Sequence, residues 1–165
     1  MATIQLHGDE IHTSGSIPEV GTSMNDFTLV DGDLGEKTLS DFSGKKIIFN
    51  IFPSVNTGVC ASSVRAFNEK VSDLEDTVVL CISKDLPFAQ GQFCGAEGLE
   101  DVVMLSDFRG SFAKDNGLLM EDGPLKGLCS RVVIVTDKKG NIVYNEQVPE
   151  ITQEPDYDAA LEAVK

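Results

Sequence analysis

A cysteine at the predicted start of a helix is the residue in this sequence best suited to chemistry. The stretch "FPSVNTGVCASSVRAFN", residues 52–68, places Cys60 between an apolar strand and an amphipathic helix. The first turn of a helix offers unpaired N–H groups and a partial positive charge, and both stabilise the nucleophilic thiolate. A small cysteine can instead pack inertly in a core. The polar neighbours Asn56 and Thr57 favour a functional role for Cys60.

Three further residues fit chemistry at this thiol. Pro53 precedes Cys60 by seven positions and would stiffen the loop and shield the sulfur from bulk water. Thr57 precedes it by three, and its hydroxyl could donate to the sulfur or accept from a substrate O–H. Arg131 opens the apolar stretch "RVVIVTD" and is either an ordinary surface arginine or a cation held near Cys60. In the second case its planar donors would stabilise a thiolate and orient an oxygen ligand.

The other three cysteines are candidates for a second thiol. No pair forms CxxC, which excludes zinc-finger and dithiol motifs, and the low cysteine content makes a framework of structural disulfides unexpected. Cys81 lies within "VVLCISK" and is predicted to be a core residue. Cys129 precedes Arg131 in a loop and could approach Cys60. Cys94 lies in a short helix among Gln, Phe and Gly, where exposure and movement are plausible, so the residues favour Cys94 and leave Cys129 open.

The elements that must position these residues follow from hydrophobic patterning. Apolar runs predict buried strands at 46–52, 77–83 and 102–107, and a closing hairpin over 131–148 with its turn at "DKKG". Helices are predicted after residue 57, from Pro87 to a stop at Gly95, before Gly117 and at the C-terminus. Residues 1–45 are punctuated by glycines and contain a predicted short hairpin and one helical turn within "TLSDFSGKK".

This order predicts the fold class. From residue 46 it reads β-α-β-α-β-α-β-β-α, which is typical of a thioredoxin-like α/β fold with a mixed, mainly parallel central sheet flanked by helices. The N-terminal β-hairpin forms an extension. We therefore expect residues 1–165 to form a single domain, with residues 1–45 as the extension and 46–165 as the core.

Composition narrows the function classes. The chain is 41% hydrophobic and 24% charged, as expected for a globular protein. Its 13 Lys and Arg against 27 Asp and Glu give a net charge of −14, which disfavours nucleic acids and anionic membranes as partners. The sequence has no apolar run near the ~18 residues of a spanning helix and no signal-peptide pattern, so we expect a cytoplasmic protein. His7 and His12 are expected to be solvated surface residues rather than metal ligands.

The spacing P-x-x-x-T-x-x-C at 53, 57 and 60 resembles that of the peroxiredoxins. The stretches "VVLCISKDLPFAQGQFCGAEG", "DGPLKGL" and "ITQEPDYDAAL" extend the likeness to the bacterial thiol peroxidases of the atypical two-cysteine type. The resemblance implies that Cys60 attacks a peroxide and becomes a sulfenic acid, with Thr57 and Arg131 at the site. It further implies that Cys94 resolves this acid through a transient disulfide with Cys60 and that thioredoxin reduces the disulfide. The family also implies a homodimer that needs no metal, haem or flavin.

Several expectations follow for the mechanism. A disulfide requires its two Cα atoms to lie within ~7 Å, so we expect local unwinding at 58–62, at 90–96, or at both. Phe88 and Phe93 could line a pocket for an alkyl chain.

Three other functions compete with a peroxidase. A disulfide oxidoreductase would need CxxC where this chain has "CASS". A redox sensor would use the same Cys60, and an acidic binding module would leave the cysteines incidental.

Overall fold

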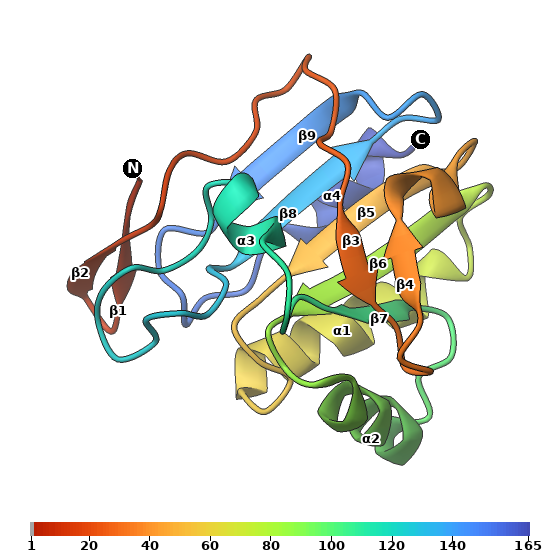
Figure 1. The fold of residues 1–165 in the computed structure, drawn as a ribbon. Coiled ribbons are helices and arrows are strands. Elements are labelled where there is room, and N and C mark those ends of the chain that lie inside the picture. The colour runs from red at the N-terminus through yellow and green to blue at the C-terminus, as the bar shows by residue number, and fades with distance from the viewer. Residues whose placement is uncertain (1) are drawn as a thin grey trace.

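A mixed β-sheet forms the centre of the protein. The computed structural model describes residues 2–165, and in them seven strands pair in the order β4-β3-β7-β6-β5-β8-β9 (Figure 1). Their bounds are β3 Thr28–Val30, β4 Glu36–Thr38, β5 Lys46–Ile51, β6 Thr77–Ser83, β7 Val103–Ser106, β8 Val132–Thr136 and β9 Ile142–Gln147. Strands β1 (Thr3–Leu6) and β2 (Asp9–His12) form a separate antiparallel hairpin, as predicted.

The sheet is mixed, but less parallel than expected. Strand β6 pairs in parallel with β5 and β7, whereas every other neighbouring pair in the sheet is antiparallel. The expectation of a mainly parallel sheet therefore holds only at its centre. Strands β3 and β4, which come from the first 45 residues, were not predicted because three residues are too few to show a periodic pattern. The division of the chain at residue 45 stays a prediction.

The helices cover both faces of the sheet. They are α1 (Gly58–Val71), α2 (Pro87–Glu97), α3 (Phe112–Asp115) and α4 (Tyr157–Ala163), with a 3₁₀ turn at Leu39–Phe42, and the predicted order is confirmed (Figure 1). The predicted end of α2 at Gly95 is wrong. The helix continues to Glu97 because Gly98 adopts the left-handed conformation, with φ +68°, that terminates it. No helix among residues 2–165 is long and apolar enough to cross a membrane.

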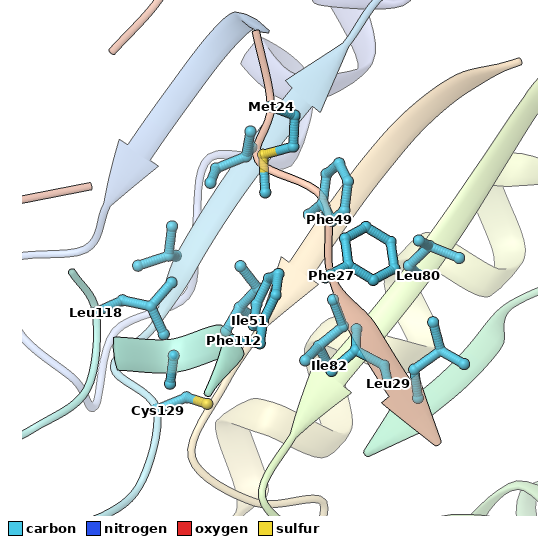
Figure 2. Close-up of a cluster of buried hydrophobic side chains, with 14 of the residues drawn as sticks. Met24, Phe27, Leu29, Phe49, Ile51, Leu80, Ile82, Phe112, Leu118 and Cys129 are labelled. Atoms are coloured by element: carbon cyan, nitrogen blue, oxygen red, sulfur yellow. The ribbon is translucent and has the colours of Figure 1, made fainter. Parts of the chain in front are cut away.

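Each face of the sheet has its own core. On one face, the Phe27 ring packs edge-on against Phe49 and Phe112, with centroids 5.9 and 5.8 Å apart, and Cys129 lies in the same cluster (Figure 2). On the other face, Cys60 and Cys81 pack with side chains of α1 and α4. Cys60 and Cys129 therefore belong to the cores on opposite faces of the sheet.

The N-terminal hairpin packs beside the loop before β8 and the segment after β9. Ile4 and Ile11 form a small cluster with Met120 and Ile151. The hairpin turns at His7 and Gly8, whose φ angles are +52° and +85°. Two consecutive positive φ angles are the geometry of a two-residue type I′ turn, which glycine adopts without strain. The Glu150 carboxylate accepts hydrogen bonds from both turn amides, at 3.3 and 2.8 Å, and so fixes the turn against the chain that follows β9.

Candidate active site

Cys60 lies in the first turn of α1, directly after the loop that follows β5. Its side chain is fully buried, at 0% exposure, on the α1 face of the sheet. Thr57 is the N-cap residue, yet its side chain makes no capping hydrogen bond. The first N–H groups of α1 therefore have no side-chain cap, and they retain their positive end charge near the Cys60 thiol.

The Thr57 hydroxyl is oriented by the preceding loop. Its Oγ1 donates a 3.0 Å hydrogen bond to the Ser54 carbonyl oxygen, and the Thr57 amide donates to the same oxygen at 3.2 Å. A hydroxyl has one proton, so this bond leaves only the oxygen lone pairs for a ligand. Of the two predicted uses of Thr57, accepting a hydrogen bond from a substrate O–H is the one that this geometry favours.

Arg131 is buried rather than on the surface. It immediately precedes β8, is 2% exposed, and its Nε donates to the Ile151 carbonyl oxygen at 2.9 Å. Its Nη1 is buried without a hydrogen-bond partner. Because buried polar groups in folded proteins are almost always paired, this nitrogen is a donor that is available to a ligand.

A pocket of about 430 Å³ brings three of the predicted residues together. Pro53, Thr57 and Arg131 line it, with Gly58 and Val59 from the first turn of α1. Cys60 is the next residue after Val59, is fully buried, and is not itself part of the lining. The rest of the wall comes from the hairpin, the loop before β8 and the segment after β9, as Leu6, His7, Pro124, Leu125, Ile151 and Thr152. None of these lining residues is acidic, and most are apolar.

Phe88 and Phe93 do not line this pocket, and their part in holding an alkyl chain stays a prediction. Phe88 is 67% exposed on α2. Phe93 packs against the core on the α1 face, and the Arg65 guanidinium lies 6.0 Å from its ring centroid. The apolar wall comes instead from segments that are distant in sequence.

The other cysteines differ in burial. All four thiols are free. Burial raises the pKa of Cys81 to about 12. Burial raises the pKa of Cys129, which lies in the core on the opposite face of the sheet, still further. Cys94 lies on α2, is only half-buried, and has a pKa that burial raises. Because the thiolate is the nucleophile, Cys81 and Cys129 are poorly suited to react with a second cysteine.

Helix α2, which carries Cys94, is tied to α1. Arg65 of α1 forms an ion pair with Glu97 of α2, and its Nε lies 2.5 Å from the Glu97 Oε1. Both helices are fully formed where unwinding is predicted, so that expectation stays a prediction about the oxidised form.

Comparison with known proteins identifies the family. The Redoxin family model matches residues 19–161. The chain is 56% identical to a thiol peroxidase of Corynebacterium glutamicum and 52% identical to one of Mycobacterium tuberculosis, in each case over 99% of both proteins. The chain belongs to the thiol peroxidases of the Redoxin family. The solved structure of a peroxiredoxin-like protein from Aquifex aeolicus is 35% identical to this chain and superposes on it with a TM-score of 0.94. The superposition covers 99% of this chain and 96% of the Aquifex protein.

Sequence reasoning missed several residues of this Redoxin site. Ser54 orients Thr57, and the Ile151 carbonyl orients Arg131, but a backbone acceptor carries no residue-type signal. His7 is exposed, as predicted, yet it lines the pocket.

His12 forms a 2.7 Å contact with Asp122, and this hydrogen bond raises the pKa of His12. Among residues 2–165, no group of three or more His, Cys, Asp or Glu side chains is arranged to hold a metal ion.

Proposed function

We propose that Cys60 reduces hydroperoxides, with Thr57, Arg131 and Pro53 forming the site around it. Membership of the thiol peroxidases makes the chain a thiol-dependent peroxidase. The observation that carries the assignment of residues is the unpaired Nη1 of buried Arg131, which lines one pocket with Thr57 and the uncapped start of α1.

In the first step, the Cys60 thiolate attacks the distal oxygen of ROOH. The S–O bond forms, the O–O bond breaks, and its electron pair leaves on RO⁻, which takes a proton from solvent. Cys60 becomes a sulfenic acid. The Thr57 oxygen accepts the peroxide O–H, while Arg131 Nη1 and the amides of the first turn of α1 stabilise the charge that moves onto oxygen.

In the second step, the Cys94 sulfur attacks the sulfur of the Cys60 sulfenic acid. A disulfide forms and the hydroxyl leaves as water. Cys94 is favoured over Cys81 and Cys129 because it is the only one of the three that is not fully buried. The two sulfurs meet after unwinding at residues 58–62, 90–96, or both. A thioredoxin dithiol then reduces the disulfide, so the cycle needs no metal, haem or flavin.

The direct test follows NADPH consumption by thioredoxin reductase and thioredoxin in the presence of this protein and a hydroperoxide. We expect sustained turnover and, after one equivalent of peroxide without reductant, a Cys60–Cys94 disulfide in the peptide mass map. A different disulfide would overturn the assignment of Cys94. Absence of turnover with thioredoxin, but not with dithiothreitol, would overturn thioredoxin as the reductant.

The Arg131→Lys variant tests the guanidinium. We expect kcat/KM for peroxide to fall about 10²-fold, because an ammonium keeps the charge but loses the fork that reaches both the Ile151 carbonyl and the ligand. Arg109→Lys, at a half-exposed arginine, is the matched control. Equal rates for the two variants would exclude Arg131 from the site.

The apolar wall supports organic hydroperoxides as preferred substrates. We expect Leu125→Ala to lower kcat/KM for cumene hydroperoxide about 10-fold, because it removes apolar contact with the substrate, and to change the value for hydrogen peroxide little. Leu34→Ala, at an exposed leucine outside the pocket, should affect neither substrate. Equal losses for both peroxides in Leu125→Ala would argue against a binding role of this wall.

We also propose a homodimer in the cytoplasm. A reducing compartment suits a catalytic disulfide that must be opened again in every cycle. Exposed Leu86 and Phe88 follow β6, and exposed Phe108 follows the adjacent parallel strand β7. Three large apolar side chains therefore lie beyond the carboxyl ends of two neighbouring strands. Sedimentation equilibrium should give twice the 17.8 kDa mass of the chain. A monomer at micromolar concentration would contradict the proposal.

A further inference from the structure

One buried polar side chain helps to hold helix α2 to the sheet, beside the partly buried ring of Phe93. Only Pro87 and Gln90 of this helix are fully buried. Gln90 is 1% exposed, and its Nε2 donates to Leu105 O at 2.9 Å and to Ser83 Oγ at 3.1 Å. Its Oε1 is buried without a partner. A helix attached by polar contacts, with an unpaired buried oxygen, is easier to release than one attached by a wide apolar face.

The hydrogen bonds continue from Ser83 to a carboxylate. Ser83 Oγ donates to Asp85 Oδ2 at 2.6 Å. The same carboxylate accepts from Ser54 Oγ at 2.7 Å and from the Val55 amide at 2.9 Å. Asp85 thus joins the loop that enters α2 to the loop that carries Thr57 and leads into Cys60.

Ser54 completes the connection to the peroxide site. Its hydroxyl is bound by Asp85, and its carbonyl oxygen accepts from both the amide and the hydroxyl of Thr57. An unbroken path of hydrogen bonds therefore runs from Gln90 through Ser83, Asp85 and Ser54 to Thr57. It links the helix that carries Cys94 to Thr57, the residue at the N-cap position of the helix that carries Cys60.

We propose that Asp85 is a positioning residue that couples the two steps of the reaction. While α2 is folded, Asp85 holds Ser54 and thereby keeps the Thr57 oxygen in place for the peroxide. When α2 unwinds to deliver Cys94, Gln90 leaves Ser83, and the hold of Asp85 on the Cys60 loop weakens. Opening at one helix thus favours opening at the other. This inference rests on the proposed roles of Cys60 and Cys94.

The Asp85→Asn variant tests the coupling through two separate rates. One is consumption of peroxide by the reduced protein, and the other is disulfide formation after one equivalent of peroxide, followed by quenching and mass measurement. We expect the first rate to fall about 10-fold, because the charge-assisted bonds to Ser54 and Val55 weaken, and the second to rise severalfold. The share of Cys60 oxidised to sulfinic acid should fall as the disulfide forms faster.

Two further variants complete the design. Ser83→Ala cuts the path between Gln90 and Asp85 with a small change in volume, so the rise in the rate of disulfide formation should persist if Asp85→Asn fails to fold. Asp31→Asn is the control, because Asp31 also accepts backbone hydrogen bonds, at 2.9 Å, but in the loop between β3 and β4. A merely structural role of Asp85 would lower both rates together or neither, and either result would overturn the proposal.

Hydrogen exchange of the reduced protein separates this inference from the proposed function. We expect Asp85→Asn, or Ser83→Ala in its place, to speed amide exchange both in residues 87–97 and in residues 57–60. Faster exchange in only one of the two segments would overturn the coupling, whatever chemistry Cys60 performs. Coupled exchange in a protein that consumes no peroxide would instead refute the proposed function alone.

Discussion

The Cys60→Ser variant should lose at least ~10³-fold in kcat/KM for every hydroperoxide, because a serine hydroxyl at neutral pH is not ionised and is a far weaker nucleophile than a thiolate. The variant should still fold, since the hydroxyl replaces a sulfur of similar shape in the first turn of α1. NADPH consumption coupled through thioredoxin and its reductase measures the loss.

Matched controls locate this effect at one sulfur. Cys81→Ala and Cys129→Ala alter thiols that are equally buried, so both should retain turnover if they fold. Circular dichroism and thermal unfolding identify any variant that loses activity through its structure. Turnover that persists in folded Cys60→Ser would assign the reaction to another residue.

The Cys94→Ser variant should lose thioredoxin-dependent turnover by at least ~10²-fold while it still consumes one equivalent of peroxide rapidly. Without the second thiol, the sulfenic acid of Cys60 has no intramolecular partner, and excess peroxide should convert it to sulfinic acid. The mass of the protein should therefore increase by one oxygen and then by two. Dithiothreitol should restore turnover, because a small thiol can reach the sulfenic acid directly.

The two cysteine variants thus fail at different steps. Cys60→Ser fails before the first oxygen transfer, and Cys94→Ser fails after it. Normal turnover with thioredoxin in Cys94→Ser would mean that another thiol resolves the sulfenic acid. The raised pKa values of Cys81 and Cys129 argue against both, and Cys129 also lies on the far face of the sheet.

The burial of Arg131 supports its place in the proposed site. A buried guanidinium with an unpaired nitrogen is costly to a fold, since desolvated polar groups normally need partners. The Ile151 carbonyl satisfies only Nε. The N–H groups of Nη1 are available for a ligand, and under the proposed function that ligand is a peroxide oxygen.

Local patterns in the sequence were sufficient for the fold class and for much of the site. The apolar run at 46–52 predicts β5, and the spacing of Val64, Phe67 and Val71 predicts α1. Pro53, Thr57 and Cys60 lie within one strand-to-helix connection, so their proximity follows from a short stretch of chain. Patterns of this kind depend on residues that are neighbours in sequence, so they can be read without knowledge of the tertiary structure.

Only the tertiary structure decided what surrounds this connection. It buries Arg131 against a carbonyl twenty residues later in the chain, makes the hairpin turn at His7 a wall of the pocket, and places Asp85 between two loops. It also places Cys129 in the core on the face of the sheet opposite Cys60 and leaves Phe88 exposed to solvent. These contacts join segments far apart in sequence, and they are set by how the strands pair and how side chains fill the space between elements, which the local sequence pattern does not encode.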